Sequence, residues 1–307
     1  MELRQLRYFV RVVELGSMGR AAQDLGVVTS ALSQQISRLE SELSTRLLQR
    51  TSTGVVPTAA GIALRQEAEL VLRHAANAAD AARAARLSGQ VTIGMAPTTS
   101  SVLGVPLLRA MEQRYPEVRL HLVESLSGNL AHMLSRRQLD LAVLFHAGSQ
   151  RGWNVRPVLS EQLFVIARPS LYGLPASGSL SLSDIIDLPL VLPTGSHGLR
   201  VIIDAAFFHY GREPNVVAQV DGLSMLMDIV HAGVAATIQP GAAVVRAQEA
   251  DFLRLPLDHD TMVRRNLIAS LADDQLSPAG LAARIVLGDV MRELVAQGRW
   301  PGASLVA

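Results

Sequence analysis

Near the N-terminus, hydrophobic residues recur with the period of an α-helix. Leu3, Leu6, Phe9, Val10 and Val13 share one face of a first predicted helix. That face needs a hydrophobic partner. We therefore expect this helix to pack beneath the helices that follow it.

Residues 17–42 predict two short helices joined by a tight turn. Ser17 is a suitable N-cap, and Gly26 can take the left-handed conformation that ends a helix. The first helix has three hydrophobic residues at helical spacing: Ala21, Ala22 and Leu25. The second begins near residues 28–30 and places four on one side: Ala31, Leu32, Ile36 and Leu39. Its opposite side is polar, with Thr29, Ser30, Ser33, Gln34, Ser37 and Arg38.

Two short helices around a glycine turn are typical of a helix-turn-helix, whose second helix presents amides, hydroxyls and Arg to base edges in a major groove. An ordinary helical hairpin with a solvated polar face has the same pattern, so this stretch alone leaves both interpretations open. Residues 47–58 predict a small β-hairpin, a wing beside the helices. Arg50 and Thr51 would lie near phosphates if DNA is bound; otherwise this is a plain surface hairpin.

A long helix is predicted from Thr58, its N-cap, to Leu87, with Ser88 and Gly89 as the stop. Thirty helical residues would span about 45 Å, too long for so small a domain to cover. The hydrophobic stripe therefore needs a partner, and a second copy of the chain is the simplest one. A lone solvated linker helix is the alternative. The stripe consists of Leu64, Val71, Ala75, Ala78, Ala82 and Ala85.

From Gln90 onward, predicted strands alternate with predicted helices, which favours a parallel sheet flanked by helices. The strands are residues 91–95, 118–123, 139–145, 162–168, 188–192, 216–220, 234–238 and 266–271. The helices are residues 101–114, 130–137, 199–210, 224–232 and 279–297.

Composition narrows the possible functions. The chain has 307 residues, long for a single core, and a net charge of +1 that neither supports nor excludes nucleic-acid binding. It has no cysteine, which excludes disulfides, thiolate metal sites and cysteine nucleophiles, and no lysine, which excludes a Schiff base or a phosphate-loop lysine.

No hydrophobic run approaches the roughly 18 residues of a membrane span, and no signal peptide is evident, so we expect a cytoplasmic protein without a membrane partner. The histidines show no metal-ligand spacing, and no nucleophile motif appears, so we expect no metal, no cofactor and no enzyme activity.

Hydroxyl groups gather where predicted helices begin just after strands. Such positions line the ligand crevice of open α/β sheets, and helix N-termini favour anions. We therefore expect a small carboxylate or similar anion as ligand, with Arg200 adding positive charge and Phe145 a wall. Taken singly, these residues are also explained as ordinary helix caps. The candidate set is Thr98, Thr99, Ser100, Ser101, Ser127, Phe145, His146, Thr194, Ser196, His197, Arg200 and Ser224.

The chain resembles the LysR-type transcriptional regulators, in particular those of the nitrogen-assimilation-control type. The N-terminal resemblance rests on residues 3–9, 16–17, 21–22, 31–36, 39–40, 47–51 and 54–55, with Thr58 and Gly61. It continues in residues 106–108, 115–118, Gly128, 139–143, 232–233 and Pro240, and so covers nearly the whole chain.

The resemblance implies a winged helix-turn-helix (residues 1–58), a linker and dimerisation helix (59–89) and two α/β subdomains like those of a type 2 periplasmic binding protein. The first subdomain would comprise residues 90–160 and 266–300, the second residues 161–265, and residues 301–307 would be a C-terminal tail. The chain would cross between the subdomains near residues 159–161 and 264–266. Tetramers that bind promoter DNA, respond to a small effector in the cleft and contact RNA polymerase are also implied.

The residues expected to contact DNA are Arg4, Thr29, Ser30, Ser33, Gln34, Arg38, Arg50, Thr51 and Thr53. This chain departs from the family in two places. Val28, Thr29 and Ser30 replace the common Ser-Gln-Pro at the start of the second helix, where Thr29 or Ser30 would have to serve as the cap. Ser52 and Thr53 replace basic wing residues. Two other functions stay open, a solute-binding protein or enzyme, and a regulator without an effector.

Overall fold

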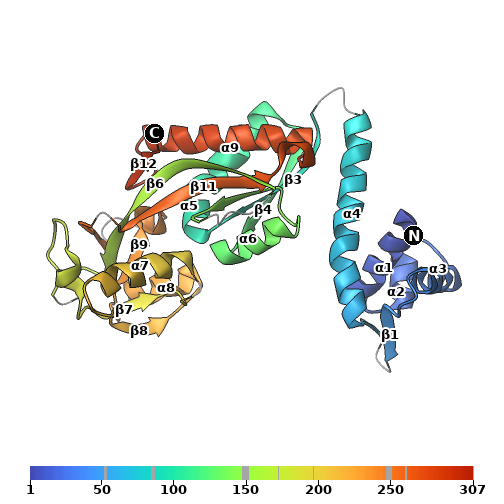
Figure 1. The fold of residues 1–307 in the computed structure, drawn as a ribbon, viewed down its shortest axis with the longest axis horizontal. Coiled ribbons are helices and arrows are strands. Elements are labelled where there is room, and N and C mark those ends of the chain that lie inside the picture. Colours follow the sequence, from blue (N-terminus) through green and yellow to red (C-terminus); the bar gives the residue numbers. More distant parts are fainter. Residues whose placement is uncertain are drawn as a thin grey trace. The chain divides into compact units, whose positions relative to one another are not determined.

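The computed structural model describes residues 1–51, 54–83, 87–146, 152–171, 173–195, 197–246, 251–259 and 261–306, with only the backbone at residues 50, 77 and 80–83. The chain folds into two compact units, Met1–Ala84 and Ala85–Ala307. Each unit is described by itself (Figure 1).

The first unit begins with three helices, α1 (Leu3–Leu15), α2 (Met18–Asp24) and α3 (Thr29–Glu42). The predicted Ser17 cap is confirmed, because its side chain accepts a hydrogen bond from the N–H of Arg20, and Gly26 has the predicted left-handed φ of 65°. The predicted cap of α3 is wrong. Val28 occupies the N-cap position, no side-chain cap is present, and Thr29 is already helical.

The wing and the long helix complete the first unit. The wing is the predicted hairpin, with β1 (Leu48–Thr51) antiparallel to β2 (Gly54–Pro57). Helix α4 (Ala59–Arg83) has the predicted cap, since Thr58 Oγ1 accepts from the N–H of Gly61 at 3.1 Å. The predicted end at Leu87 is wrong. Leu87 is not helical and packs against the core of the second unit, which draws the chain out of the helix.

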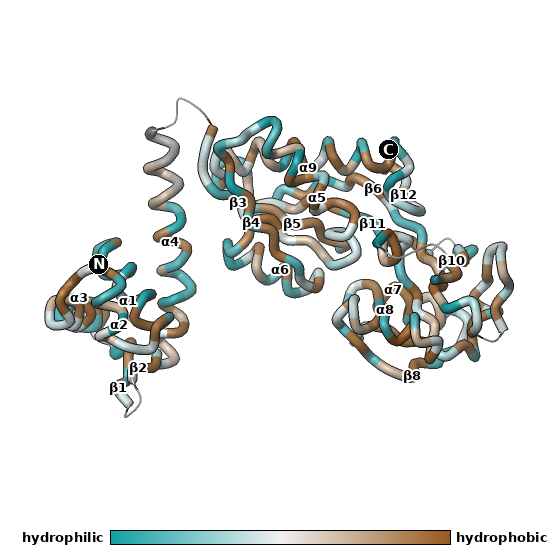
Figure 2. Tube along the Cα trace, turned by 180° about the vertical axis from the view of Figure 1, so that it is seen from behind, coloured by the Kyte–Doolittle hydropathy of each residue, from teal (hydrophilic) through white to brown (hydrophobic). Residues whose placement is uncertain are grey.

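The hydrophobic stripe predicted on α4 is only partly free. Leu64 and Ala68 pack into the core of the first unit, whereas Val71 and Ile62 are 40% and 52% exposed. The side chains of Ala82 and Ala85 lie outside the described residues. In Figure 2 the tube of α4 alternates between hydrophilic and hydrophobic residues along its length. The helix thus carries hydrophobic surface that its own unit does not cover.

The second unit is an α/β structure built on one large sheet. Its elements in chain order are β3 (Gly89–Met95), α5 (Pro97–Arg114), β4 (Val118–Glu124), α6 (Ser127–Ser135), β5 (Leu141–Leu144), β6 (Trp153–Ala167), β7 (Leu190–Leu192), α7 (Gly198–His209), β8 (Val216–Gln219), α8 (Leu223–His231), β9 (Thr237–Pro240), β10 (Leu253–Pro256), β11 (Val263–Leu271), α9 (Pro278–Ala296) and β12 (Ala303–Leu305). Short 3-10 helices lie at Leu182–Ile185, Gly241–Val244 and Asp273–Gln275.

The prediction of a parallel sheet is only partly correct. The path β10-β6-β11-β5-β3-β4 has parallel pairs at β3–β4 and β3–β5, and β7–β8 forms a separate parallel pair. Strands β6 and β11 pair antiparallel with each other and with their other neighbours. The alternation of strands and helices along the sequence predicts the parallel βαβ segments. It does not predict the antiparallel pairing of β6 and β11, which arises where the chain returns to the first core.

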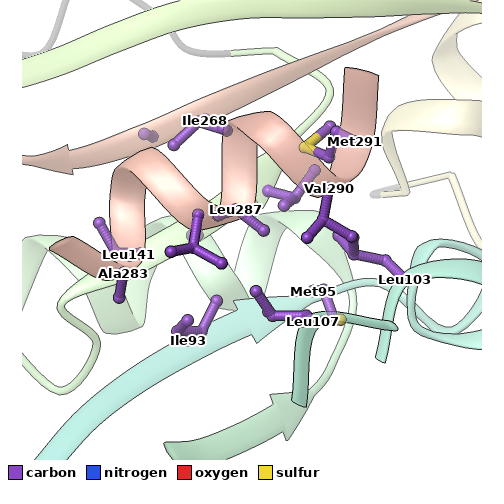
Figure 3. Close-up of a cluster of buried hydrophobic side chains, with 14 of the residues drawn as sticks. Ile93, Met95, Leu103, Leu107, Leu141, Ile268, Ala283, Leu287, Val290 and Met291 are labelled. Carbon is purple, nitrogen blue, oxygen red and sulfur yellow. The ribbon is translucent and has the colours of Figure 1, made fainter. Parts of the chain in front are cut away.

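Two large hydrophobic cores occupy the second unit. Figure 3 shows part of the first, in which Ile93 and Met95 of β3 meet Leu287 of α9. Gly94, between these two residues of β3, faces the other side of the sheet and lies against Leu130 of α6. A Cβ added at Gly94 would lie 2.7 Å from Leu130 Cδ2. Helices α9 and α6 therefore cover opposite faces of the sheet (Figure 1).

Strands β6 and β11 run from one core into the other (Figure 1). Leu159 belongs to the first core and Leu163 to the second, both on β6. On the returning path, Met262 belongs to the second core and Ile268 to the first. The change of core therefore falls between residues 159 and 163 on β6 and between residues 262 and 268 on the returning path.

The described C-terminal residues 301–306 include a strand, whereas the prediction made this segment a tail. Ala303–Leu305 forms β12, which pairs antiparallel with β6 opposite Glu161 and Ser160. Trp300 is buried just before it, and its indole N–H donates to Glu161 Oε1 at 2.8 Å. A buried indole with a hydrogen-bond partner fixes the path of the last residues.

We predict that Gly61→Ala destabilises the first unit by about 2 kcal/mol or more, because overpacking a site that cannot relax is costly. A Cβ at Gly61 would lie 2.1 Å from the carbonyl oxygen of Leu47, a backbone atom. The thermal midpoint should fall by several degrees. The control is Gly19→Ala on α2, where the nearest atom is 4.0 Å away and stability should hold or rise. Equal midpoints for the two variants would contradict the assignment.

Candidate DNA-binding surface and effector cleft

Helix α3 separates buried from exposed residues sharply. Leu32, Ile36 and Leu39 are buried against α1 and α2, so the opposite face is left to solvent. Five predicted polar residues of that face are exposed: Thr29, Ser30, Gln34, Ser37 and Arg38. Ser33 is half-buried at its margin, and Ala31, predicted to be inward, is exposed.

The helix is tied to the wing through one carboxylate. Glu40 Oε1 accepts from the N–H of Leu47 at 2.7 Å and of Leu48 at 3.0 Å. The wing in turn closes on α1, because the N–H of Val55 donates to Gly16 O at 2.9 Å. Backbone hydrogen bonds to a carboxylate are strong and directional. The hairpin is therefore held in one position beside α3.

Among the predicted backbone-contacting residues, Arg4 and Arg38 are both exposed. Arg4 reaches Glu2 at 3.3 Å, while Arg38 makes no ion pair with any described residue. Thr51 is exposed, and its Oγ1 donates to Gly54 O at 3.2 Å. The side chain of Arg50 and the whole of Thr53 lie outside the described residues.

A small cavity of about 20 Å³ lies within the second unit, between residues that precede β6 and residues that follow it. It is just large enough for about one water molecule, so the cleft is nearly closed in this structure. It is lined by Ala96, Pro97, Thr98, Leu126, Pro193, His197, Val220, Asp221, Leu223, Leu226, Gln239 and Arg264.

A buried ion pair stands at the inner end of the cavity. Arg264 donates from Nε and Nη2 to Glu161 Oε2, at 3.0 and 2.7 Å, and from Nη2 to Thr98 Oγ1 at 3.0 Å. Glu161 Oε2 also accepts from Asn266 Nδ2 at 2.6 Å. The guanidinium carbon lies 3.7 Å from the centroid of the Phe145 ring. Arg264 and Glu161 are 1% and 0% exposed.

His197 brings an imidazole to the same cavity. Its Nδ1 accepts from the N–H of Leu199 at 3.2 Å, so the proton of the neutral ring sits on Nε2. Burial, and after it the nearby charge of Arg264, lowers the pKa of His197 below its ordinary value. Hydrogen bonds from Thr194, the backbone N–H first, lower the pKa of Asp221 on the rim. The cavity therefore contains a neutral histidine and an ionised aspartate near neutral pH.

Among the predicted effector residues that the structure describes, Thr98 and His197 are the two in the lining of the cavity. Ser127 lies close by, with its Oγ 3.3 Å from where a Cβ on Gly198 would be. Thr99 is fully buried, and its Oγ1 bonds to no described residue. Ser101 Oγ donates to Thr98 O and Ala242 O, and Ser100 Oγ bonds to Glu124.

The other predicted effector residues lie elsewhere. Phe145 is buried under the guanidinium of Arg264, and His146 and Ser224 are exposed. Thr194 bonds to Asp221, outside the lining. Arg200 turns to Asp204 at 2.6 Å and lines a separate depression with Phe208. Ser196 lies outside the described residues.

Sequence reasoning missed the groups that give the cavity its chemistry. Arg264, Gln239 and Asp221 line it, and Glu161 holds Arg264. Arg264 and Glu161 do fall at the crossings placed from the family resemblance. A charged residue at each crossing was the available signal, because a buried charge needs a partner.

The described helices include none that is both long enough and hydrophobic enough to cross a membrane. Within the same residues, no three His, Asp or Glu side chains come together as a metal site. These findings concern the described part of the chain only.

A winged helix-turn-helix followed by a two-core α/β unit with a cleft defines a class, the DNA-binding transcriptional regulators with an effector-binding domain. Residues 3–62 match the bacterial regulatory helix-turn-helix proteins of the lysR family, and residues 84–292 match the LysR substrate binding domain. The chain belongs to the LysR family of transcriptional regulators, a family of regulators and not of enzymes.

Named relatives agree with this assignment. The nitrogen assimilation regulatory protein nac of Klebsiella aerogenes is 34% identical over 246 residues, which cover 79% of each chain. The regulator BbuR of Bordetella bronchiseptica is 28% identical over 302 residues, 97% of this chain and 92% of BbuR. CbnR in complex with its target DNA is 24% identical, with a TM-score of 0.73 over 95% of this chain and 100% of that one. That likeness extends the match to the fold.

We predict that acid destabilises the native chain more than a His197→Asn variant, whose amide oxygen can still accept from Leu199. The folded pKa of His197 is depressed, so the unfolded state binds more protons and stability falls as pH drops below about 6.5. Thermal midpoints of both proteins between about pH 7.5 and about pH 5, in steps of about 0.5, measure the difference. The native midpoint should fall by a few degrees more; parallel curves would contradict the prediction.

Proposed function

We propose that the chain is a sequence-specific regulator that presents the exposed face of α3 to the major groove of promoter DNA. The observation that carries this proposal is the division of α3, with Leu32, Ile36 and Leu39 buried and a row of hydroxyl, amide and guanidinium groups left in solvent. Such groups recognise base edges and phosphates. CbnR, whose fold is similar, has been solved in complex with its target DNA, which supports the proposal.

In this proposal Thr29, Ser30, Ser33 and Gln34 read base edges. Five other residues contact the DNA backbone or a groove: Arg4, Arg38, Arg50, Thr51 and Thr53. The start of α3 has no side-chain cap, so its first N–H groups stay available to an acceptor such as a phosphate oxygen. This gives a use to the one place where α3 departs from the family's common capping residues.

The proposal includes assembly into dimers of dimers, with residues 59–89 as the linker and dimerisation element. Exposed Ile62 and Val71 on α4 support it, because their own unit leaves them uncovered. Contact with RNA polymerase would follow from binding at promoters. A regulator of this kind acts in the cytoplasm.

We further propose that a small anionic effector binds between the two regulatory subdomains, residues 90–160 with 266–300, and residues 161–265. The cavity is lined from both, and the strands β6 and β11 that join them meet at its inner end. A ligand there would change the angle between the subdomains and so the DNA contacts. Regulation without an effector is the competing form of this function.

Replacing Gln34 by Ala should change the order of preference among promoter fragments. A bidentate amide contact is worth about 1–3 kcal/mol of discrimination against a wrong base, or roughly thirtyfold at the centre of that range. Fluorescence anisotropy on a panel of fragments that differ by single base pairs measures it. The matched control is Gln113→Ala, an exposed glutamine on α5 of the second unit. Uniform weakening on every fragment by Gln34→Ala would refute a reading role.

A footprint on the DNA upstream of the protein's own gene tests the function as a whole. We expect protection without added acids and an altered pattern with an effector. Protection that no small organic acid alters would favour the form without an effector. No protection of any promoter fragment would contradict the proposed function.

A further inference from the structure

The guanidinium of Arg264 is held in one orientation by contacts on several sides. The ring of Phe145 lies under the plane of the guanidinium. Glu161 accepts hydrogen bonds from Nε and Nη2, and Thr98 accepts a further one from Nη2. A buried arginine with so many fixed contacts loses little further freedom when it binds something else. It is a preorganised group at the inner end of the cavity.

One nitrogen of that guanidinium is left over. Nη1 of Arg264 donates to no described residue, although the side chain is only 1% exposed and lines the cavity. A buried donor without an acceptor costs free energy, so it favours any acceptor that enters. This donor belongs to a side chain that lines the cavity.

Two neighbours in the lining have free hydrogen-bonding groups as well. His197 uses Nδ1 as an acceptor, which leaves Nε2–H as a donor without a described partner. Gln239 is 5% exposed, and its amide also bonds to no described side chain or backbone group. Around them the walls are hydrophobic: Ala96, Pro97, Leu126, Pro193, Val220, Leu223 and Leu226.

We propose that Arg264 is the residue that receives the effector and that the effector is a short-chain monocarboxylate. One carboxylate oxygen accepts from Arg264 Nη1 and the other from the Nε2–H of His197 or the amide of Gln239, while the short alkyl part meets the hydrophobic walls. This deepens the proposed function and rests on it.

Charge and size argue against a second carboxylate on the ligand. Glu161 already balances the charge of Arg264, and Asp221 on the rim is ionised. A second carboxylate on the ligand would therefore enter a region whose described residues offer no free cation and one nearby anion. The cavity of about 20 Å³ holds about one water molecule, so any of these acids requires the cleft to widen, and a short monocarboxylate requires the least widening.

The position of Arg264 couples the ligand to the joint between the subdomains. Arg264 on β11 and Glu161 on β6 pair at the register position where both strands change core. Asn266 and Trp300 share the same carboxylate. An anion at Nη1 would share the charge of the guanidinium with Glu161, and would so act directly on the pair that joins β6 to β11.

Calorimetric titration of the full chain with acetate, propionate and butyrate tests the proposal. Propionamide and malonate are the comparison ligands. We expect at least one monocarboxylate to bind at least tenfold more tightly than propionamide and than malonate. Binding of none of the three acids, or no preference for them over the amide, overturns the proposal. This arm needs no variant.

A second arm removes the charge of Arg264. The double variant Arg264→Gln/Glu161→Gln avoids a lone buried carboxylate, which would itself destabilise the fold. Its affinity for the best acid should fall at least tenfold. The control is Arg254→Gln, an exposed arginine stacked 5.6 Å from the Phe164 ring and away from the cavity, which should bind the acid as the native chain does. Unchanged binding by a folded double variant overturns the proposal.

The same preparations are tested for binding to the upstream DNA. Native protein that protects DNA but binds no acid refutes this inference and leaves the DNA-binding function intact. Native protein that ignores DNA refutes the proposed function instead.

Discussion

A buried carboxylate, that of Glu161, joins three segments of the second unit where β6 pairs with β11. Glu161 accepts from Arg264, Asn266 and Trp300, which come from β11 and from the segment before β12. An ionised carboxylate costs several kcal/mol to bury, and only good geometry with satisfied hydrogen bonds offsets that cost. Here the donors are fixed by strands on both sides, so the carboxylate joins the return path of the chain, its C-terminus and the inner wall of the cleft at one point.

The same requirement that buried polar groups be paired explains how the wing is held beside α3 in the first unit. Glu40 sits at the end of α3 and accepts from two backbone N–H groups that begin the wing. Glycines then allow the close contacts that keep the unit compact, since an added Cβ at Gly54 would lie 2.4 Å from Gly16 O. The hydrophobic side of α3 fixes its orientation, and the polar side is left available as a consequence of that packing.

Local features of this fold were predictable because their cause is local. The Ser17 cap, the Gly26 turn and the Thr58 cap each depend on a few neighbouring residues, and each was found as predicted. The cap of α3 was wrong, because the chain starts that helix at Thr29 without a polar cap. The predicted linker helix also does not include Leu87, which packs against the first core of the second unit, whereas residues 84–86 lie outside the described residues.

The site was less predictable than the fold, since its chemistry comes from residues far apart in sequence. Hydroxyls at helix starts mark the edge of the crevice, and Thr98 and His197 do line it. Arg264, which gives the cavity its positive charge, pairs with Glu161, 103 residues away in the sequence. A periodic pattern of residues cannot predict a pair so far apart. Arg200, the cation suggested by proximity in sequence, is taken by Asp204 within its own helix.

A double-mutant cycle on Arg264→Met and Glu161→Met tests the central claim most directly. Both tryptophans, Trp153 and Trp300, lie in the second unit, so their fluorescence during urea unfolding reports on that unit. If Arg264 and Glu161 stabilise the unit as a pair, each single variant should lose about 3–5 kcal/mol of the free energy of unfolding. The double variant should lose much less, so that the coupling energy between the two residues is about 2 kcal/mol or more. Losses that add to within about 0.5 kcal/mol would show that the two residues act independently and would contradict the account.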